Sequence, residues 1–350
     1  MTEVRLMLQE SLDQLLGAAD GVATAAMEAG GLPHGLWDEI EASGFSRAFE
    51  LGAESIAWTD AYPIFEATGR HATPAPLAET AFAGWLLAQA GIAQPEGVLS
   101  FARCDAIDSE VFDVDISDVP WGRAAAHVVL VSPGPEGQVA LIETARLGWV
   151  LDVNMALEPR DSLKAKAMTV IARGAHGHTV DLVQVGGALV RSAQIAGALK
   201  RCLELTVQYS NERVQFGRSI GKFQAIQQQI AHFASLSLMA GNAAECAFAD
   251  AGGLNSQLTA VAKISAGDAG DVGAAVAHAV HGAMGFTKEY MLHFSTRRIW
   301  AWRGEYGSSA WWAERLGAAM CAAGEDGLWP AIVTGHATPF LTNPMMRNRA

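Results

Sequence analysis

The sequence predicts a mainly α-helical protein with a small β domain between two helical regions. Apolar residues recur at helical spacing near the N-terminus and again from Val180 onward. Between these regions, short β-branched runs alternate with turn sequences such as Ser132-Pro133-Gly134-Pro135, a pattern typical of strands. With 350 residues, 50% of them apolar and 17% charged, the chain is long enough for two or three domains and a large buried core.

Residues 1–98 are expected to form an N-terminal helical domain. An Ala/Leu-rich helix is expected over residues 77–91, because Pro74 and Pro76 provide a start signal directly before it. An earlier helix is indicated by a leucine stripe at Leu8, Leu12, Leu15 and Leu16.

Residues 99–178 are expected to form the small middle domain, a β-barrel or sheet. Its strand candidates are four short runs rich in β-branched residues, at 97–101, 111–114, 127–131 and 139–142. This block is expected to end near residues 172–178.

Residues 179–350 are expected to form a C-terminal four-helix bundle. The first helix begins at Val180, and the other three are expected over residues 224–251, 259–280 and 294–323. One face of the first helix is predicted to be lined by Leu189, Ala193, Ala196, Leu203 and Val207.

The composition excludes several classes of partner. A formal net charge of −13 argues against binding to nucleic acid or to an anionic membrane surface. We identify neither a signal peptide nor an apolar run long enough to span a bilayer. The four cysteines are far apart without paired spacing, as expected for thiols in a cytoplasmic protein.

The segment from Glu212 to Gln227 places a cation, amides and two glycines between two predicted helices. In one interpretation Arg213 pairs with Glu204 or Glu212, while Phe216 and Phe223 pack in the core. In the other, Arg213 binds a pyrophosphate with its forked guanidinium and Gln224 contributes a planar amide.

A second segment, His278 to Tyr290, ends an Ala-rich helix at a glycine-containing turn. Backbone amides in such a turn can bind phosphate or ribose oxygens, because glycine allows close approach. His278 and His281 have the spacing of a metal pair, but no carboxylate or thiol partner is evident, so we predict no metal site.

These two segments resemble the acyl-CoA dehydrogenase family. The pattern Arg213-x-Gln215-Phe216-Gly217-(x)6-Gln224 is similar to the family's flavin-contacting helix junction. Residues 281–289 are similar to its His-Gly-Gly-x-Gly-Phe-Thr-x-Glu segment, and Pro74-Ala75-Pro76-Leu77-Ala78-Glu79-Thr80 to a phrase of its N-terminal domain. With the helical–β–helical order, the resemblance covers nearly the whole chain.

The resemblance implies an FAD-dependent oxidoreductase that desaturates an acyl-CoA thioester between Cα and Cβ. A carboxylate removes the Cα proton, while hydride leaves Cβ for the flavin. The positions that correspond to contacts with the FAD of a neighbouring subunit are Arg213, Val214, Gln215, Phe223 and Gln224. Those assigned to the other end of the cofactor are Ala279, Val280, His281, Gly282 and Ala283, and Ser308 is also assigned to the cofactor.

The sequence departs from the family at functionally important positions. Ala279 replaces the usual glutamine, and Ala283 replaces the second glycine of the pair. The two positions where branches of the family carry the base are Tyr306 and the helix near Gly187. Glu305, one residue away, is the candidate base, although it could instead form an ion pair with Arg298 or Arg303.

The β region also lacks the family's Thr-Glu-Pro-x-x-Gly-Ser-Asp-like loop, which covers the flavin. This loss resembles the second subunit of heteromeric bacterial members that act on bulky substrates such as steroid side chains. In such a pair one chain supplies the base and the flavin loop, while the other completes the flavin site.

Three functions therefore remain open: an acyl-CoA dehydrogenase with Glu305 as base, a non-catalytic partner subunit, and a flavin-dependent monooxygenase on the same fold. The resemblance implies fatty acid or steroid degradation, and a homotetramer or heterotetramer with a second such chain. It also implies an electron-transfer flavoprotein or similar acceptor. A patch at a subunit interface, or one that stacks an adenine, is indicated by Trp300, Trp302, Trp311 and Trp312 beside Arg297, Arg298 and Arg303.

Overall fold

The N-terminal region is helical, as predicted. The computed structural model describes residues 3–17, 21–52, 55–107, 109–251 and 253–335. Its first helices are α1 (Glu3–Gly17), α2 (Gly21–Glu28), α3 (His34–Ser43), α4 (Tyr62–Arg70) and α5 (Leu77–Gln89). In the leucine stripe Leu12 and Leu16 are buried, and Leu8 and Leu15 are partly buried. The helix α5 begins directly after Pro76, which confirms the predicted start.

The middle region is a curled five-stranded sheet. Its strands are β1 (Leu99–Arg103), β2 (Val111–Pro120), β3 (His127–Val131), β4 (Gln138–Glu143) and β5 (Arg160–Ala175), in the order β1-β3-β4-β5-β2. The pair β1–β3 is parallel, whereas the other pairs are antiparallel. The four predicted strands are confirmed, although β2 extends further.

The long strand β5 was not predicted. Its second half alternates exposed and half-buried residues, and it contains Lys164, Lys166 and Arg173. A strand that faces solvent on one side needs no continuous apolar run, so its sequence does not show the pattern used to find the other four. The strands begin at Leu99 and end at Ala175. The division into separate domains at residues 98 and 178 stays a prediction.

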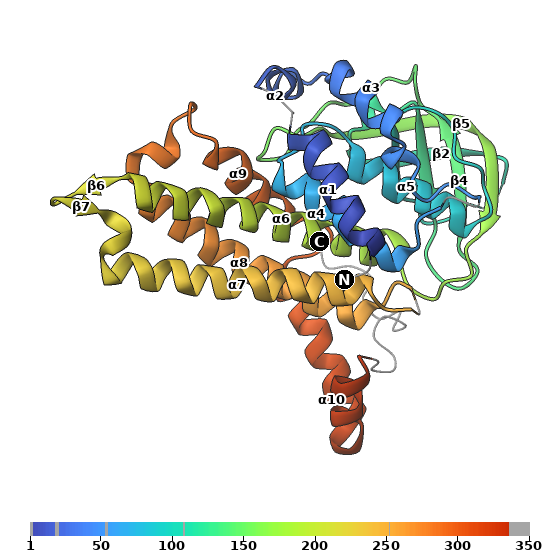
Figure 1. Cartoon of the computed structure of the whole chain (residues 1–350). Coiled ribbons are helices and arrows are strands. Elements are labelled where there is room, and N and C mark those ends of the chain that lie inside the picture. The colour runs from blue at the N-terminus through green and yellow to red at the C-terminus, as the bar shows by residue number, and fades with distance from the viewer. Residues whose placement is uncertain (1–2, 18–20, 53–54, 108, 252, 336–350) are drawn as a thin grey trace.

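The C-terminal region is a helical bundle whose longest member is α6 (Leu182–Glu212). A two-stranded hairpin, β6 (Val214–Gln215) and β7 (Arg218–Ser219), connects it to α7 (Gln224–Phe248). The helix α8 (Ser256–His281) packs against both α6 and α7, and α9 (Leu292–Trp302) and α10 (Ser309–Thr334) follow. Figure 1 shows the bundle on one side of the molecule, the sheet on the other, and the hairpin at the far tip of the bundle. The predicted fold class is confirmed.

The prediction of one helix over residues 294–323 is wrong. The helix α9 ends at Trp302 and α10 begins at Ser309. Between them Tyr306 and Gly307 have positive φ angles of 55° and 94°, which interrupt a regular helix. Gly324, with a φ of 70°, likewise divides α10 into two segments at a kink. The Ser308 hydroxyl accepts a hydrogen bond from the Trp311 amide and so caps α10. This break places Glu305 in a turn, where its side chain can reach the sheet.

The helix α6 passes through the centre of the protein. Of the predicted face, Leu189, Ala193 and Ala196 are buried, but Val207 is 39% exposed, while its neighbour Thr206 is buried. Near the hairpin, the buried face of α6 is therefore not the predicted one. By length and hydropathy α6 could span a bilayer, which the sequence analysis did not foresee. However, 94% of its apolar window is buried within the protein, as in the core helix of many folds without a membrane span.

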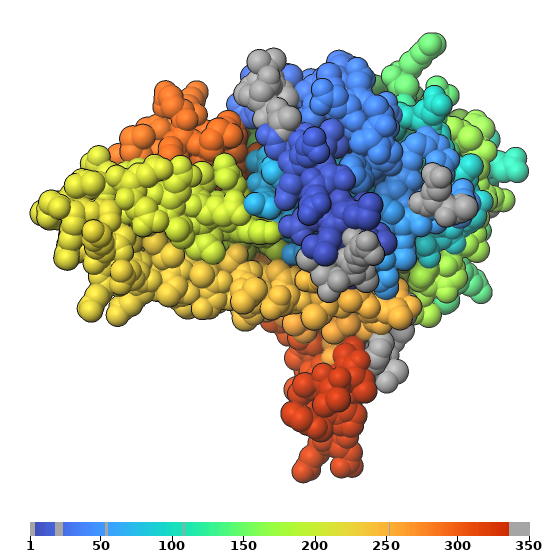
Figure 2. All heavy atoms as spheres, viewed as in Figure 1, coloured from blue at the N-terminus to red at the C-terminus, as the bar shows by residue number. Residues whose placement is uncertain are grey.

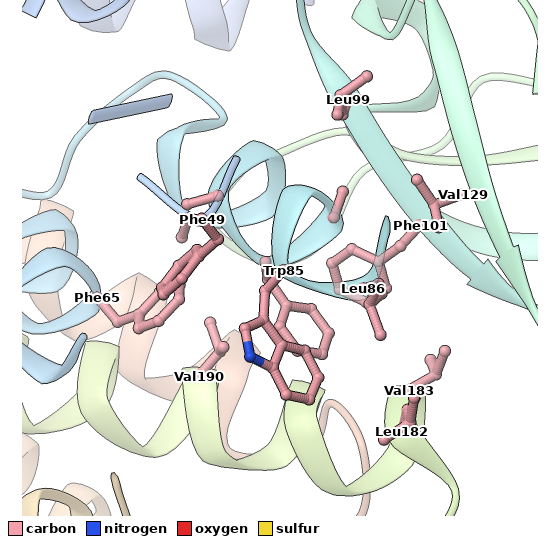
Figure 3. Close-up of a cluster of buried hydrophobic side chains, with 14 of the residues drawn as sticks. Phe49, Phe65, Trp85, Leu86, Leu99, Phe101, Val129, Leu182, Val183 and Val190 are labelled. Atoms are coloured by element: carbon pink, nitrogen blue, oxygen red, sulfur yellow. The ribbon is translucent and has the colours of Figure 1, made fainter. Parts of the chain in front are cut away.

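One continuous apolar core joins all three regions. Trp58, Phe65 and Phe248 pack face to face or tilted, with ring centroids 4.9–6.1 Å apart. Figure 3 shows α5 between the sheet and α6, with Trp85 and Leu86 among side chains from both sides. This packing fixes the position of the sheet relative to α6 and therefore shapes the cleft between them.

Candidate functional site

The Glu305 carboxylate is held by two arginines and an asparagine. The Arg191 Nε lies 2.7 Å from one carboxylate oxygen, and the Arg160 Nε lies 2.9 Å from the other. The Asn154 amide also donates, at 3.0 Å. Burial alone would raise the pKa of Glu305, but Arg160, Arg191 and these hydrogen bonds lower it to about 2. The carboxylate therefore stays ionised and is a weak proton acceptor in this arrangement.

The partners of Glu305 belong to a larger buried network of charges. Arg191 also pairs with Glu79 at 2.9 Å, and Arg160 pairs with Glu158 at 3.0 Å. Glu158 accepts further bonds from Arg298, at 3.1 Å, and from the Trp302 indole, at 2.8 Å. Three carboxylates thus face three guanidinium groups, and removal of any one would leave a buried charge uncompensated.

The predicted alternative partners of Glu305 are wrong. Arg298 pairs with Glu158, and Arg303 pairs with Asp271. The turn between α9 and α10 points Glu305 towards Arg160 at the start of β5, whereas Arg298 lies within α9 and Arg303 directly follows its end.

Tyr306 packs against Gly187, so the two positions where the family resemblance places a base touch each other. A Cβ atom at Gly187 would lie only 2.7 Å from the Tyr306 ring. The ring also stacks on Phe101, with centroids 6.0 Å apart. Its backbone carbonyl accepts bonds from the side chains of Gln184 and Trp312. Within the described residues, neither base position carries a carboxylate.

A cavity of about 720 Å³ lies between the sheet and the bundle, and Glu305 forms part of its wall. Its polar lining residues include Asn154 and Arg160, and Phe101 and Tyr306 contribute aromatic surface. The remaining lining residues include both apolar and charged side chains, among them Arg103, Asp118, Asp152, Met155, Val183 and Gln184. The cavity could accept an apolar ligand, but the Glu305 carboxylate in its wall is already paired with Arg160 and Arg191.

At the opposite end of α6, the hairpin exposes its functional candidates. Within the described residues, the side chains of Arg213, Gln215 and Gln224 form no hydrogen bond or ion pair. Phe216 is 91% exposed, and the Arg218 guanidinium lies 4.1 Å from the centre of the Phe223 ring. Figure 2 shows the hairpin as an exposed tip.

The interpretation of this segment as an internal ion pair with core aromatics is therefore wrong. Glu204 pairs with Arg70 and Arg201, and Glu212 accepts from Gln208. Arg213 remains exposed because the chain leaves α6 at this residue and turns into the hairpin.

The second motif lies beside the first. The His281 ring stacks on Tyr209, near the end of α6, with centroids 4.5 Å apart. Its Nδ1 donates to the Ala277 carbonyl at 2.7 Å, which leaves Nε2 to accept from the Tyr290 hydroxyl at 3.0 Å. Burial lowers the pKa of His281, in keeping with a neutral ring.

In residues 279–283, the groups available to a ligand belong mainly to the backbone and not to the side chains. Val280 and His281 are buried, whereas Ala279, Gly282 and Ala283 are exposed. Gly282 has a φ of 58° and a ψ of −138°, a conformation that suits glycine and turns the chain out of α8. His278 donates to or accepts from Thr296, and the described residues contain no cluster of three metal-ligating side chains.

The structure thus separates the predicted site residues into two groups. Arg213 to Gln224 and Ala279 to Ala283 lie at the tip, whereas Glu305 lies at the cleft and Ser308 follows in the same turn. Gln184 lines the cleft near the start of α6, so the groups lie roughly 40 Å apart along this helix, at about 1.5 Å per residue. One copy of the chain does not bring them together.

The prediction that the tryptophan and arginine residues between 297 and 312 form one surface patch is wrong. Trp302 and Trp312 are buried, and Arg298 is buried with them. Trp300 is 41% exposed, and Arg303 lies over its ring at 4.9 Å. A helix turns about 100° per residue, so residues that are close in this sequence point to different sides and do not form one face.

Three residues that contact Glu305 were not predicted from the sequence: Arg160, Arg191 and Asn154. A signal was present for Arg191, because it is a single charge within the apolar run of α6 and a buried charge requires partners. No comparable signal marked Arg160, which begins the unpredicted strand β5.

Comparisons with known proteins extend these observations. Residues 186–321 match the family model described as acyl-CoA dehydrogenase, C-terminal domain. Acyl-CoA dehydrogenase IpdE2 from Mycobacterium tuberculosis is 29% identical over 310 residues, which cover 85% of this chain and 91% of that protein. IpdE2 from Mycolicibacterium smegmatis is 27% identical, with coverage of 85% and 93%.

Solved structures share the fold at lower identity. The Tcur3481-Tcur3483 steroid ACAD variant has a TM-score of 0.78 and 22% identity, and the match covers 91% of this chain and 98% of that chain. The ChsE4-ChsE5 complex from Mycobacterium tuberculosis has a TM-score of 0.78, 18% identity and coverage of 92% and 98%. A glutaryl-coenzyme A dehydrogenase in complex with glutaryl-CoA has a TM-score of 0.76, 19% identity and coverage of 92% and 96%.

Proposed function

From the premise that this chain belongs to the acyl-CoA dehydrogenase family, we propose that it is a non-catalytic partner subunit. In this role it completes the FAD site of a second, unlike chain that supplies the catalytic base. The observation that carries the proposal is the neutralised state of Glu305, whose carboxylate oxygens receive Arg160 and Arg191. A base in such a pair would have to leave both arginines before it could accept a proton.

The exposed tip supports the same role. Arg213, Arg218 and Lys222 place three cations within ten residues of an otherwise acidic chain. They suit a pyrophosphate bound by a neighbouring chain, because a guanidinium binds phosphate oxygens through two parallel hydrogen bonds. The Gln224 amide and the backbone around Gly282 offer further hydrogen bonds beside them.

FAD fits these residues, and when bound in the partner's site it would accept the hydride from an acyl-CoA thioester. Arg213 and Gln224 of this chain would contact the dinucleotide across the interface with the partner chain. Their side chains are free to do so because they make no contacts within the described part of their own chain. The Phe223 ring, beside the Arg218 guanidinium at 4.1 Å, would limit the access of water.

Two relatives suggest the assembly and the substrate. One similar structure is a complex of two unlike chains, ChsE4 and ChsE5, and another is described as a steroid ACAD. We infer a heterotetramer that acts on the CoA thioester of a bulky acyl group, with an electron-transfer flavoprotein as acceptor.

The visible absorbance of the purified chain tests the proposal. The chain alone should be colourless, and a co-purified complex with its unlike partner should be yellow. A stoichiometric flavin band in the chain alone would overturn the partner role.

The enzyme hypothesis keeps one observation in its favour, since Glu305 lines a cavity of about 720 Å³. Anaerobic addition of acyl-CoA to the complex, with flavin bleaching as the measurement, distinguishes the enzyme hypothesis from the partner proposal. Under the partner proposal, flavin bleaching should be unchanged in Glu305→Gln as long as the complex assembles. Loss of bleaching with flavin still bound would instead assign Glu305 as the base.

A further inference from the structure

A second cavity is lined by residues of α1, α4, α6 and α7, away from both groups of predicted site residues. Figure 1 shows the four helices. Its volume is about 340 Å³. The space exists because α7 presents small residues towards α4, among them Ala234 and Gly241, which leave the gap between helices unfilled. Pro63, Ala196 and Leu203 add an apolar wall.

Glu66 lines this cavity and is incompletely satisfied. It is 5% exposed, and its one hydrogen bond within the described residues comes from the Lys200 ammonium at a long 3.4 Å. Burial raises the pKa of Glu66, although the charges of Lys200 and Arg70 oppose this effect. A buried carboxylate normally has several close donors, so one of its oxygens is left with unused capacity.

Two hydroxyl groups of the same cavity are also available to a ligand. The hydroxyls of Tyr62 and Ser237 line the cavity and form no hydrogen bond with any described residue. Tyr62 is close enough to Glu66 and Glu245 for both carboxylates to raise its pKa further, after burial. The polar wall of the cavity therefore favours a ligand that donates hydrogen bonds and carries positive charge.

The two cations of the cavity differ in mobility. Arg5 is buried and donates to Asp60, Glu245 and the Thr59 carbonyl. The Lys200 side chain is 43% exposed, and its one polar contact in the described part of the chain is the long one with Glu66. Lys200 can therefore move into solvent at little cost, whereas Arg5 is held in place.

We propose that this cavity binds a small organic cation, a primary alkylammonium ion with a short apolar chain. The ammonium group donates to Glu66 and to the Tyr62 hydroxyl and displaces Lys200 into solvent. The alkyl chain packs on Pro63, Ala196 and Leu203. An anionic ligand is disfavoured, because it would pair with Lys200 alone and would leave Glu66 buried beside a like charge. This site is independent of the proposed partner role.

Calorimetric titration of the full chain with n-butylammonium tests the proposal. Matched titrations use n-butanol and n-butyrate, which carry a similar chain with a neutral or an anionic end. We expect n-butylammonium to bind at least tenfold more tightly than either, as charge-assisted hydrogen bonds do. Equal binding of n-butanol, tighter binding of n-butyrate, or no binding of n-butylammonium would each overturn it.

Two variants test the assigned contacts. Glu66→Gln should weaken n-butylammonium binding about tenfold. Lys200→Met keeps the apolar stem and removes the competing cation, so it should strengthen binding several-fold. Because Lys200 is half exposed, this variant should fold even if Glu66→Gln does not. Weaker binding in Lys200→Met, or unchanged binding in a folded Glu66→Gln, would contradict the site.

Discussion

The two ends of α6 carry the predicted functional residues in opposite states. At the hairpin end, Arg213 and Gln224 are exposed and unpaired within the described residues. At the cleft end, Arg191 and Glu305 lie in a network in which each charge has opposite partners. The residues suited to contact another chain make no such bonds within the described residues, whereas the carboxylate proposed as base is paired with two arginines. This contrast is the physical basis of the proposed partner role.

Among the variants that test this contrast, removal of Arg191 should have the largest effect on stability. The change Arg191→Met leaves Glu79 unpaired and leaves Glu305 with Arg160 and Asn154 alone. We expect the free energy of unfolding to fall by about 4 kcal/mol, because one partner of a buried ionic network is lost. Urea denaturation measures this change.

Arg213→Ala is the matched control from the hairpin end. Because Arg213 is exposed and unpaired, this variant should change stability by less than about 0.5 kcal/mol. Similar losses at the two positions would contradict the contrast between the two ends of α6.

The contact between Gly187 and Tyr306 gives the next largest effect. An alanine Cβ at Gly187 would lie 2.7 Å from the ring, closer than packing allows. We expect Gly187→Ala to destabilise the protein by about 2 kcal/mol, as overpacked core substitutions do. Thermal unfolding followed by circular dichroism measures it.

Gly317→Ala in α10 is its control, since nothing lies within 4 Å of the new Cβ. It should be neutral or slightly stabilising, because alanine favours helices. If Gly187→Ala is as stable as Gly317→Ala, the Tyr306 ring does not pack tightly against Gly187.

Lys263, near the cleft end of α6, should make the stability of the protein depend on pH. It is fully buried, and its amine donates to the Trp302 carbonyl at the end of α9. Burial lowers its pKa to about 7 from an ordinary value of 10.5. Between these values the unfolded chain binds a proton that the folded protein does not, so stability should rise as the pH increases from 7.

The expected rise from pH 7 to pH 9 is about 2 kcal/mol, measured by urea denaturation across this range. In Lys263→Met this contribution should disappear, and the two stability curves should converge towards high pH. An identical slope in the variant would show that Lys263 keeps its ordinary pKa.

The smallest expected effect concerns flavin affinity at the hairpin end. In the complex with an unlike partner, Arg213→Ala should weaken FAD binding about tenfold, because it removes a charge-assisted hydrogen bond to phosphate. Flavin fluorescence on dilution reports the release. Glu212→Ala, one residue earlier on an exposed site, should leave the affinity unchanged or slightly improved. Equal release in both variants would argue against a specific role for Arg213.

Much of the fold could be predicted from local patterns. The strands β1, β3 and β4 are rich in apolar residues, and α5 begins at the proline signal. Short stretches of sequence were therefore sufficient to predict these elements. The strand β5 could not be found in this way, since it faces solvent on one side. The break between α9 and α10 was also missed, although Gly304 and Gly307 were present, because helices tolerate isolated glycines.

The candidate site was only half predictable. The hairpin candidates could be named because their order along the chain is itself the motif, and their role in holding FAD stays a prediction. The arginines that neutralise Glu305 come from α6 and from the start of β5, 114 and 145 residues away. No local pattern connects residues at such separations.

The sequence by itself determined the fold class, the family resemblance and the identity of the residues at the hairpin, because these depend on local periodicity and on short ordered motifs. Only the tertiary structure decided that Glu305 is paired, that Tyr306 lies on Gly187 and that the two groups of candidate residues lie at opposite ends of α6. The physical reason is that the charge state of a carboxylate depends on burial and on the neighbours that packing brings to it, and these come from distant parts of the chain.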